Sequence, residues 1–469
     1  MSAADRAHPP QTDVERIPEI VARLRETFRD RRTRPLEWRE EQLRRLGELL
    51  SRHDDELVAA LQADLRKPSL EAWMADIAST RAEADLARKQ LRAWTKPERV
   101  RIPLSQRPGR ARIVRDPLGV VLIIGPWNYP VQLVLTPLVG ALAAGNCVVL
   151  KPSEVTAHTS AALAKLVPRY LDPDAVAVVE GGVAETTALL AERFDHIFYT
   201  GNGRVGRVVM AAAAKHLTPV TLELGGKSPC LVDSDVDMDV AVRRIAWGKF
   251  LNAGQTCIAP DYVLVHESRE RELLDGLART LREFYGDDPQ RSPDLARIAS
   301  DRHHERLVKL LESGEVVAGG QTDAAERFVA PTILRDVKPD SPVMEDEIFG
   351  PILPVLKVRD MDQAIDFVNQ REKPLALYVF TRRPEVEERV VSRTTSGGVC
   401  VNATLWHIAN PHLPFGGVGE SGLGAYHGRQ SFEVFSHRKS VLRKPTRFDV
   451  RFVYPPYTKG KLALLKRLL

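Results

Sequence analysis

Gly119-Val-Val-Leu-Ile-Ile-Gly-Pro-Trp-Asn-Tyr-Pro130 is an apolar run that passes directly into a loop. An uninterrupted apolar strand is typical of a parallel sheet that is covered on both faces. In open α/β sheets, ligands bind outside the carboxyl ends of such strands. The stretch therefore predicts an α/β fold in which the loop around Asn128 borders a site.

A glycine-rich stretch, His196–Met210, lies between a predicted strand and a predicted helix. It places Gly201, Gly203 and Gly206 in GxGxxG spacing, which in this context is typical of a dinucleotide-binding turn. Under that fingerprint alone, the acidic residue about twenty positions further on, Glu223, would bind a ribose.

One cysteine, Cys257, stands in the loop Asn252-Ala-Gly-Gln-Thr-Cys-Ile-Ala-Pro260. The helix-forming run 240–250 precedes the loop and an alternating strand pattern over 262–267 follows it, so Gly254 can form the turn. Such a turn can hold a sulfur at the floor of a cleft, where we expect Cys257 to act as a nucleophile. The alternative is a small buried side chain without chemistry, because only a thiolate-stabilising environment makes a cysteine reactive.

A candidate general base lies in the stretch Thr221-Leu-Glu-Leu-Gly-Gly-Lys-Ser-Pro229. Glu223 lies between two leucines, and desolvation would raise its pKa toward the range of a general base. A strand glutamate that points to solvent is the plain alternative.

Residues 215–230 and 254–262 together resemble the aldehyde dehydrogenase family, most closely its class 3 branch. The resemblance extends from about Pro18 to Tyr457. It implies a Rossmann-like cofactor-binding domain, an α/β catalytic domain and a small β element that bridges subunits. The implied ranges are 13–96 and 116–223 for the cofactor-binding domain, 224–425 for the catalytic domain, 97–115 and 426–446 for the bridging element, and 1–12 and 458–469 for flexible termini.

The resemblance also implies the roles of three catalytic residues. Cys257 would add to the aldehyde, and Glu223 would activate water. Asn128 would stabilise the oxyanion together with the backbone N–H of Cys257. Without the resemblance, Asn-Tyr-Pro at 128–130 would be equally consistent with an ordinary turn.

The expected cofactor is NAD or NADP. Two polar residues, Lys151 and Glu154, end the apolar strand of 145–154, and the resemblance assigns them to the adenosine ribose. Because they supply a separate ribose site, Glu223 is assigned to the chemistry. The remaining implied cofactor contacts are Gly201 and Gly206 at the pyrophosphate, and Glu347 and Phe349 of Glu345-Asp-Glu-Ile-Phe-Gly-Pro351 at the nicotinamide ribose and ring.

Composition excludes several other classes of protein. The 469 residues carry a net charge of +5 spread along the chain, which gives little support to nucleic-acid binding. Four cysteines without CxxC spacing argue against a disulfide framework or a metal site, and they indicate a reducing compartment, the cytoplasm. The segment 1–19 lacks the apolar region of a signal peptide. Residues 118–150 contain no charged residue and would be long enough to cross a bilayer. Three prolines interrupt this run, however, so it does not predict a transmembrane helix.

Helical periodicity dominates the segment from Asp13 to about Ala93, and its leucines fall on one face. These leucines are Leu43, Leu46, Leu50, Leu57, Leu61 and Leu65. The segments 101–115 and 431–443 are expected to form the strands of the bridging element, which predicts a homodimer. We also expect Tyr129, Trp247 and Phe415 to line the substrate pocket.

The end of the chain, 459–469, is basic and leucine-rich. It is too short to span a bilayer, so docking on the protein or fraying is favoured over peripheral membrane contact.

The sequence leaves two rival functions open. A CoA-acylating dehydrogenase would release its thioester to CoA and has less need of Glu223 as a base. A protein of this fold without activity is the other rival, because a fold does not determine a function. The likeness to class 3 favours medium- to long-chain aliphatic or aromatic aldehydes.

Overall fold

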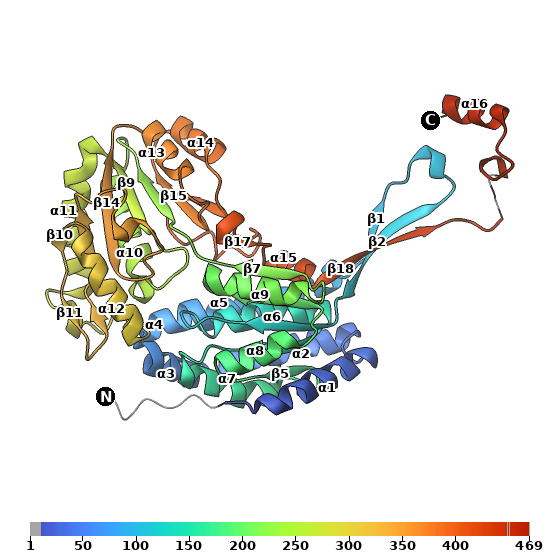
Figure 1. Cartoon of the computed structure of the whole chain (residues 1–469), viewed down its shortest axis with the longest axis horizontal. Coiled ribbons are helices and arrows are strands. Elements are labelled where there is room, and N and C mark those ends of the chain that lie inside the picture. Colours follow the sequence, from blue (N-terminus) through green and yellow to red (C-terminus); the bar gives the residue numbers. More distant parts are fainter. Residues whose placement is uncertain (1–10, 448, 450, 469) are drawn as a thin grey trace.

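Two sheets covered by helices and one long three-stranded arm make up the fold of the computed structural model (Figure 1). It describes residues 11–447, 449 and 451–468. The predicted α/β class is confirmed, because parallel strands alternate with helices in both sheets.

The first sheet has six strands in the order β17-β7-β6-β3-β4-β5, parallel except at β17. Its strands are β3 (Val120–Ile124), β4 (Cys147–Lys151), β5 (Val176–Val178), β6 (His196–Thr200), β7 (Val220–Glu223) and β17 (Gly422–Leu423). The helices that follow these strands are α6 (Gln132–Ala144), α7 (Ala157–Tyr170), α8 (Val183–Ala191) and α9 (Gly203–Ala214). The domain ranges stay a prediction, and in the structure β17 lies within 224–425 yet pairs with β7.

The apolar strand β3 is buried on both faces. In β3, Val120 and Leu122 pack into one hydrophobic cluster, whereas Val121 and Ile123 pack into another. This alternation follows from the two-residue period of a strand. Helix α1 (Ile17–Arg29) belongs to the first cluster together with α8 and α9, and α6 and α7 belong to the second.

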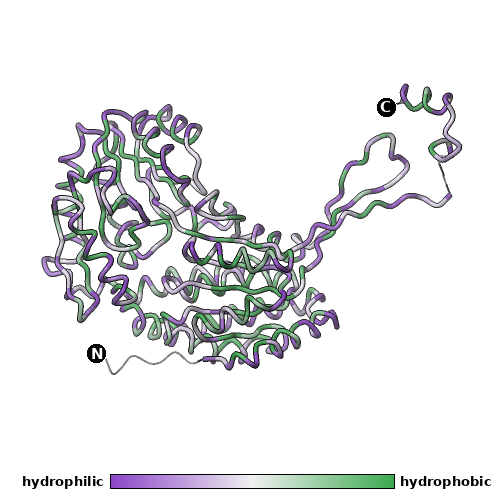
Figure 2. The backbone as a smooth tube through the Cα atoms, viewed as in Figure 1, coloured by the Kyte–Doolittle hydropathy of each residue, from purple (hydrophilic) through white to green (hydrophobic). Residues whose placement is uncertain are grey.

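The predicted leucine face is also confirmed, because all six leucines are buried. They lie on α2 (Leu36–Arg52) and α3 (Asp54–Leu65), which pack with α5 (Ser79–Trp94) against α6 and α7. Figure 2 shows the apolar residues gathered along the strands and the inward helix faces. Between α3 and α5 lie the short α4 (Ser69–Glu71) and the π-helix η3 (Ala72–Ala78).

The second sheet has seven strands in the order β10-β13-β14-β9-β8-β15-β16. Its strands are β8 (Pro229–Val232), β9 (Tyr262–His266), β10 (Glu315–Ala318), β13 (Thr332–Arg335), β14 (Ile352–Val358), β15 (Ala376–Phe380) and β16 (Gly398–Val401). A small hairpin joins β11 (Thr322–Asp323) to β12 (Phe328–Val329). The helices around this sheet are α10 (Met238–Phe250), α11 (Glu270–Tyr285), α12 (Asp301–Leu310), α13 (Met361–Asn369) and α14 (Pro384–Arg393).

The arm is an antiparallel sheet of β1 (Glu98–Val100), β2 (Arg110–Pro117) and β18 (Ser436–Arg443). It extends away from both sheets (Figure 1), and α15 (Gly428–Val434) leads into it. Because β18 pairs only with β2, one side of β18 has no strand beside it within the described residues.

The flexible termini expected at 1–12 and 458–469 stay a prediction. Most of 1–12 lies outside the described residues, and the Thr12 N–H donates to the Glu180 carbonyl oxygen (2.9 Å). At the other end, the segment forms α16 (Lys459–Leu468). Lysine, alanine and leucine are strong helix formers, which accounts for the helix. Within the described residues, no helix is long and apolar enough to cross a membrane.

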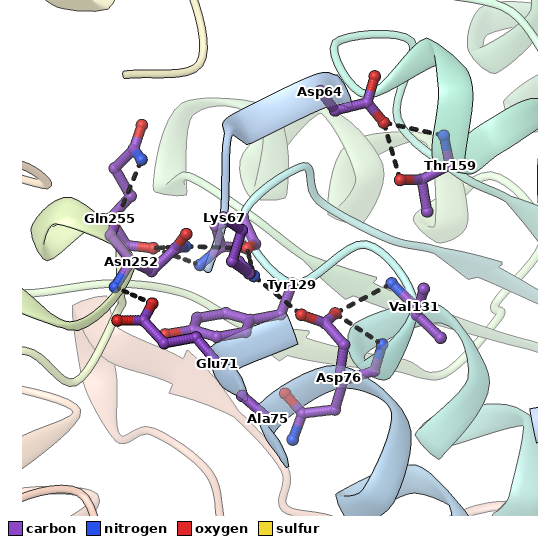
Figure 3. A network of polar contacts seen from close by, with 12 residues as sticks. Asp64, Lys67, Glu71, Ala75, Asp76, Tyr129, Val131, Thr159, Asn252 and Gln255 are labelled. Atoms are coloured by element: carbon purple, nitrogen blue, oxygen red, sulfur yellow. Dashed lines mark hydrogen bonds and ion pairs between the residues drawn. The ribbon is translucent and has the colours of Figure 1, made fainter. Parts of the chain in front are cut away.

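One buried carboxylate joins α3 to the start of α7. Asp64 accepts hydrogen bonds from the Thr159 N–H (2.8 Å), the Thr159 hydroxyl (2.7 Å) and the His158 N–H (3.1 Å). Figure 3 shows Asp64 facing Thr159. The carboxylate thus satisfies N–H groups that a helix start leaves without partners.

Asp64→Ala should lower the stability of the fold by about 2 kcal/mol, because it leaves these buried donors unpaired. In a thermal scan this corresponds to a midpoint lower by roughly 2–4 °C. Asp55→Ala, on the exposed side of α3, is the matched control and should change the midpoint little. Equal midpoints for the two variants would contradict the capping role.

Candidate active site

The thiol loop begins with an unusual backbone conformation. Asn252, Ala253 and Gly254 all have positive φ (53°, 53° and 72°) in the short helix η5 (Leu251–Gly254). A Cβ at Gly254 would lie 2.3 Å from the Gly350 carbonyl oxygen, so no side chain fits there. The turn aims the following residues, including Cys257, back toward the end of the first sheet.

The surroundings of Cys257 favour the neutral thiol. Burial raises the pKa of Cys257 well above its usual value, and the carboxyl groups of Glu347 and Glu223 raise it further. The backbone N–H groups of Cys257 and Ile258 act in the opposite direction. A neutral thiol is a weak nucleophile, so this site needs a base.

Glu223 ends β7 and is buried, with 3% of its surface exposed. Neither of its carboxyl oxygens has a hydrogen-bond partner among the described residues. Burial raises its pKa well above the usual range. A desolvated carboxyl group with free oxygens beside a thiol can accept and return a proton.

Asn128 follows β3 and is buried beside the thiol loop. Its side-chain Nδ2 donates to the carbonyl oxygen of Gln255 (3.1 Å), two residues before Cys257. An amide nitrogen carries two N–H donors, so this bond leaves one for a ligand. The loop after β3 and the loop before β9 therefore meet at the thiol.

A cavity of about 330 Å³ opens beside Cys257. Most of its lining is apolar, with the side chains of α5 and α6 on one wall and the stretch 405–411 on another. Tyr129 and Trp247 line it, as expected, whereas Phe415 does not. Instead, Phe415 packs its ring against those of Tyr426 and His407 behind the cavity.

Sequence reasoning missed two titratable side chains that line this cavity, Glu83 and His427. Glu83 accepts a hydrogen bond from the Gly428 N–H, and burial raises its pKa to about 7. His427 has a buried Nε2 without a partner among the described residues. No local motif indicates either residue. Glu83 lies on α5, and it contacts Gly428 only because the fold brings α5 against the start of α15.

Lys151 and Glu154 lie at the end of β4, with Nζ and the Glu154 carboxylate 3.8 Å apart. Burial lowers the pKa of Lys151, and Glu154 is the largest of the acidic groups that oppose this. The Glu154 side chain is 42% exposed. A half-exposed carboxylate beside a buried lysine fits the two hydroxyl groups of a ribose.

The glycine turn lies between β6 and α9. Asn202 caps the helix by accepting the Val205 N–H (3.0 Å). A Cβ at Gly201 would lie 2.2 Å from the Tyr199 hydroxyl, and one at Gly206 would lie 2.9 Å from Leu224. A side chain at Gly201 would therefore clash, and one at Gly206 would require Leu224 to shift, so the glycines let the start of α9 lie close to the end of the sheet. The free N–H groups of a helix start suit a pyrophosphate.

Glu347 is closely packed against the Gly-Gly turn after β7. A Cβ at Gly225 would lie 1.9 Å from its carboxylate, and burial raises the pKa of Glu347 to about 8. Nearby, the buried Nζ of Lys249 has no partner among the described residues. Phe349 packs edge-on against Trp127 (5.2 Å between centroids). The Lys249 ammonium group without a partner and the closely packed Glu347 carboxylate fit a site in which a bound polar ligand supplies the missing hydrogen bonds.

The structure therefore brings Glu223, Glu347 and Asn128 close to the loop that carries Cys257. Lys151 and Glu154 lie at the neighbouring strand end, as do Gly201 and Gly206 beside α9. No group of three or more potential metal-binding side chains occurs in the part of the chain that the structure describes.

Comparison with known proteins adds independent evidence. The model of the "Aldehyde dehydrogenase family" matches residues 3–441. "Aldehyde dehydrogenase, dimeric NADP-preferring" of Mus musculus is 51% identical over 442 residues, which are 94% of this chain and 98% of that protein. "Aldehyde dehydrogenase family 3 member B1" of Homo sapiens is 50% identical over 449 residues, which are 95% and 96% of the two chains.

A solved structure described as "Substrate bound state of Staphylococcus Aureus AldH" matches with a TM-score of 0.94 at 45% identity. The match covers 96% of this chain and 99% of that one. The family model and these relatives extend over nearly the whole chain, so the chain belongs to the aldehyde dehydrogenase family.

Proposed function

We propose that this protein oxidises aldehydes to carboxylates with NAD(P)+ and that Cys257, Glu223 and Asn128 carry the chemistry. One observation supports this most strongly. Glu223 is a buried carboxyl group whose two oxygens have no hydrogen-bond partner among the described residues, and it lies close enough to Cys257 to add to the raised pKa that burial and Glu347 give the thiol. That pair can exchange a proton and then activate water.

In the first step, the thiol proton of Cys257 passes to Glu223, and the sulfur adds to the aldehyde carbon. A C–S bond forms and the carbonyl oxygen becomes an oxyanion. The free N–H of the Asn128 side chain and the backbone N–H of Cys257 stabilise that charge. The product of this step is a thiohemiacetal on Cys257.

Bound NAD(P)+ supplies a hydride acceptor for the conversion of the thiohemiacetal to a thioester. Glu223 releases to solvent the proton that it took from the thiol and then takes a proton from water, and the resulting hydroxide adds to the thioester carbon. The C–S bond breaks, Glu223 returns its proton to the departing sulfur to restore the Cys257 thiol, and the product leaves as a carboxylate after losing its own proton to solvent. Dividing the oxidation into two covalent steps lowers each barrier.

The residues that would hold the cofactor are Lys151 and Glu154 at the adenosine ribose, the start of α9 at the pyrophosphate, and Glu347 at the second ribose. Relatives from Mus musculus, Rattus norvegicus and Canis lupus familiaris are named "NADP-preferring". We infer that both cofactors are used, because the half-exposed Glu154 can turn away from a 2′-phosphate.

The substrate class follows from the cavity. Its walls are mainly aliphatic and aromatic, which supports medium- to long-chain aliphatic or aromatic aldehydes. Of the two rival functions, CoA acylation leaves the buried Glu223 without a role. An inactive scaffold leaves the association of Cys257, Glu223 and Asn128 without a role.

We also propose a homodimer formed through the arm. The strand β18 offers a free edge, and Val100, Leu104 and Leu442 are exposed apolar side chains of the arm. A relative named "dimeric" supports the same assembly.

The cytoplasm is the proposed location, since all four cysteines are unpaired. Peripheral membrane contact through α16 is a secondary proposal, supported by exposed leucines next to lysines.

Glu223→Gln should stall the reaction at the acyl-enzyme, because the amide cannot activate water. We expect a burst of about one equivalent of reduced nicotinamide per site, then a slow steady state. Mass spectrometry should find an acyl group on Cys257. Because Glu223 also deprotonates the thiol, we expect the burst to be slower than in the wild type, and a higher pH should restore part of its rate by ionising Cys257.

Cys257→Ala is the control for this experiment and should give no burst while it still binds the cofactor. Loss of cofactor binding in Glu223→Gln, with normal single-turnover chemistry, would show instead that Glu223 is a ribose ligand. Rescue by CoA but not by water would favour the acylating rival.

Glu154→Gln should raise the NADP to NAD ratio of kcat/KM by about 3- to 10-fold, because it removes a negative charge near the 2′-phosphate. Steady-state kinetics with both cofactors measures this ratio. Glu37→Gln, on the exposed part of α2, should leave it unchanged. An unchanged ratio in Glu154→Gln means that Glu154 is not at the ribose.

The full chain should scatter light as a dimer of the 52.3 kDa polypeptide at micromolar concentration. Replacing the exposed Leu104 and Leu442 by glutamate should shift it toward the monomer without loss of secondary structure, because buried like charges oppose association. A monomeric wild-type protein contradicts the bridging role of the arm, whereas a tetramer changes only the number of subunits.

A further inference from the structure

A buried ion pair lies directly behind the loop that carries Asn128. Lys67, between α3 and α4, and Asp76, on η3, have fully buried side chains with Nζ and Oδ2 2.8 Å apart. Figure 3 shows Lys67 next to the Tyr129 ring and bonded to Asp76, which in turn faces the N–H of Val131.

Both members of the pair bind the backbone of that loop. Lys67 Nζ donates to the Asn128 carbonyl oxygen (2.9 Å) and lies 4.1 Å from the centre of the Tyr129 ring. Asp76 Oδ1 accepts the N–H groups of Val131 and Gln132 (3.2 Å each), where α6 begins. The segment 128–132 is thus held at its carbonyl end and at its N–H end by opposite charges.

The same network continues into the thiol loop. Asn252 Nδ2 donates to the carbonyl oxygens of Asn128 (2.9 Å) and Gln255 (3.2 Å). Asn128 Nδ2 donates to that same Gln255 oxygen (3.1 Å). The hydroxyl groups of Tyr129 and Thr256 are 2.7 Å apart. Asn128 and Tyr129 therefore bond to Gln255 and Thr256, which lie within two residues of Cys257.

Stability alone is a poor explanation for this pair. Removing two charges from water costs several kcal/mol per ion, and well-packed apolar side chains often stabilise such a position equally well. What an apolar pair cannot supply is a donor for the Asn128 carbonyl oxygen and acceptors for the two N–H groups beyond it. The pair therefore specifies the position of the loop.

We propose that Lys67 is a positioning residue that acts through Asn128, holding its side-chain amide where the oxyanion forms. Asp76 holds Lys67 in place. This inference rests on the proposed role of Asn128 in the reaction. A displacement of about 1 Å at such a donor costs on the order of 100-fold in rate.

The test is a double-mutant cycle with Lys67→Met, Asn128→Ala and the double variant of the full-length protein. The quantity measured is the single-turnover rate of nicotinamide reduction, with the aldehyde KM recorded alongside. Lys67→Met should lower the rate about 10- to 100-fold and change KM less than about 3-fold. In the Asn128→Ala background, the same change should cost less than about 3-fold, because its target is gone.

Arg39→Met is the matched control. Arg39 is also a buried cation that donates to backbone carbonyl oxygens, those of Thr33, Arg34 and Ala143, but it lies at the other end of α6. It should lower the thermal midpoint yet leave the single-turnover rate of the folded enzyme within about 3-fold, with or without Asn128.

A loss in Lys67→Met that multiplies fully with that of Asn128→Ala would overturn the proposal. If Lys67→Met does not fold, Asp76→Asn replaces it, since it keeps an acceptor for the α6 N–H groups but weakens the hold on Lys67. The same lack of additivity is expected, and full additivity counts against the proposal. An Asn128→Ala enzyme at wild-type rate would refute the role of Asn128 itself, a separate result.

Discussion

The hydrogen bond from Asn128 Nδ2 to the Gln255 carbonyl oxygen joins loops that belong to different sheets. Asn128 follows β3 of the first sheet, and Gln255 precedes β9 of the second. The proposed oxyanion donor and the nucleophile therefore come from separate halves of the molecule, and this contact sets their spacing. The positive φ angles at 252–254 direct the thiol loop toward that contact, and such strain persists only where surrounding bonds hold it.

Burial away from water changes the pKa of each ionisable group in the site. Burial raises the pKa of Cys257, Glu223 and Glu347 alike, so each binds a proton more tightly than it would in water, and an ionised Glu223 is a correspondingly stronger base. A proton that moves from the thiol to a carboxylate leaves the net charge of the buried space unchanged, whereas a lone added charge would be costly there. The largely apolar cavity beside them keeps this environment dry while an aldehyde chain occupies it.

Much of the fold could be predicted because its signals are local. The buried strand 120–124, the leucine face of α2 and α3, and the glycine turn at 201–206 each depend on residues close in sequence, and dihedral preferences act at that range. The segment 459–468 forms a helix for a related reason, since lysine, alanine and leucine are helix formers that act locally.

Other features depend on contacts between residues far apart in the chain. By itself, the sequence determined where the strands lie, that Cys257 stands in a loop between a helix and a strand, and that Glu223 lies between two leucines at a strand end. Only the tertiary structure decided that Phe415 lies behind the cavity and that Glu83 lines it. Likewise, Lys67 reaches the Asn128 carbonyl oxygen across 61 positions of sequence, and no local motif marks it. The segments that the fold places around a side chain decide its burial and its hydrogen bonds. The spacing of residues along the sequence reveals neither.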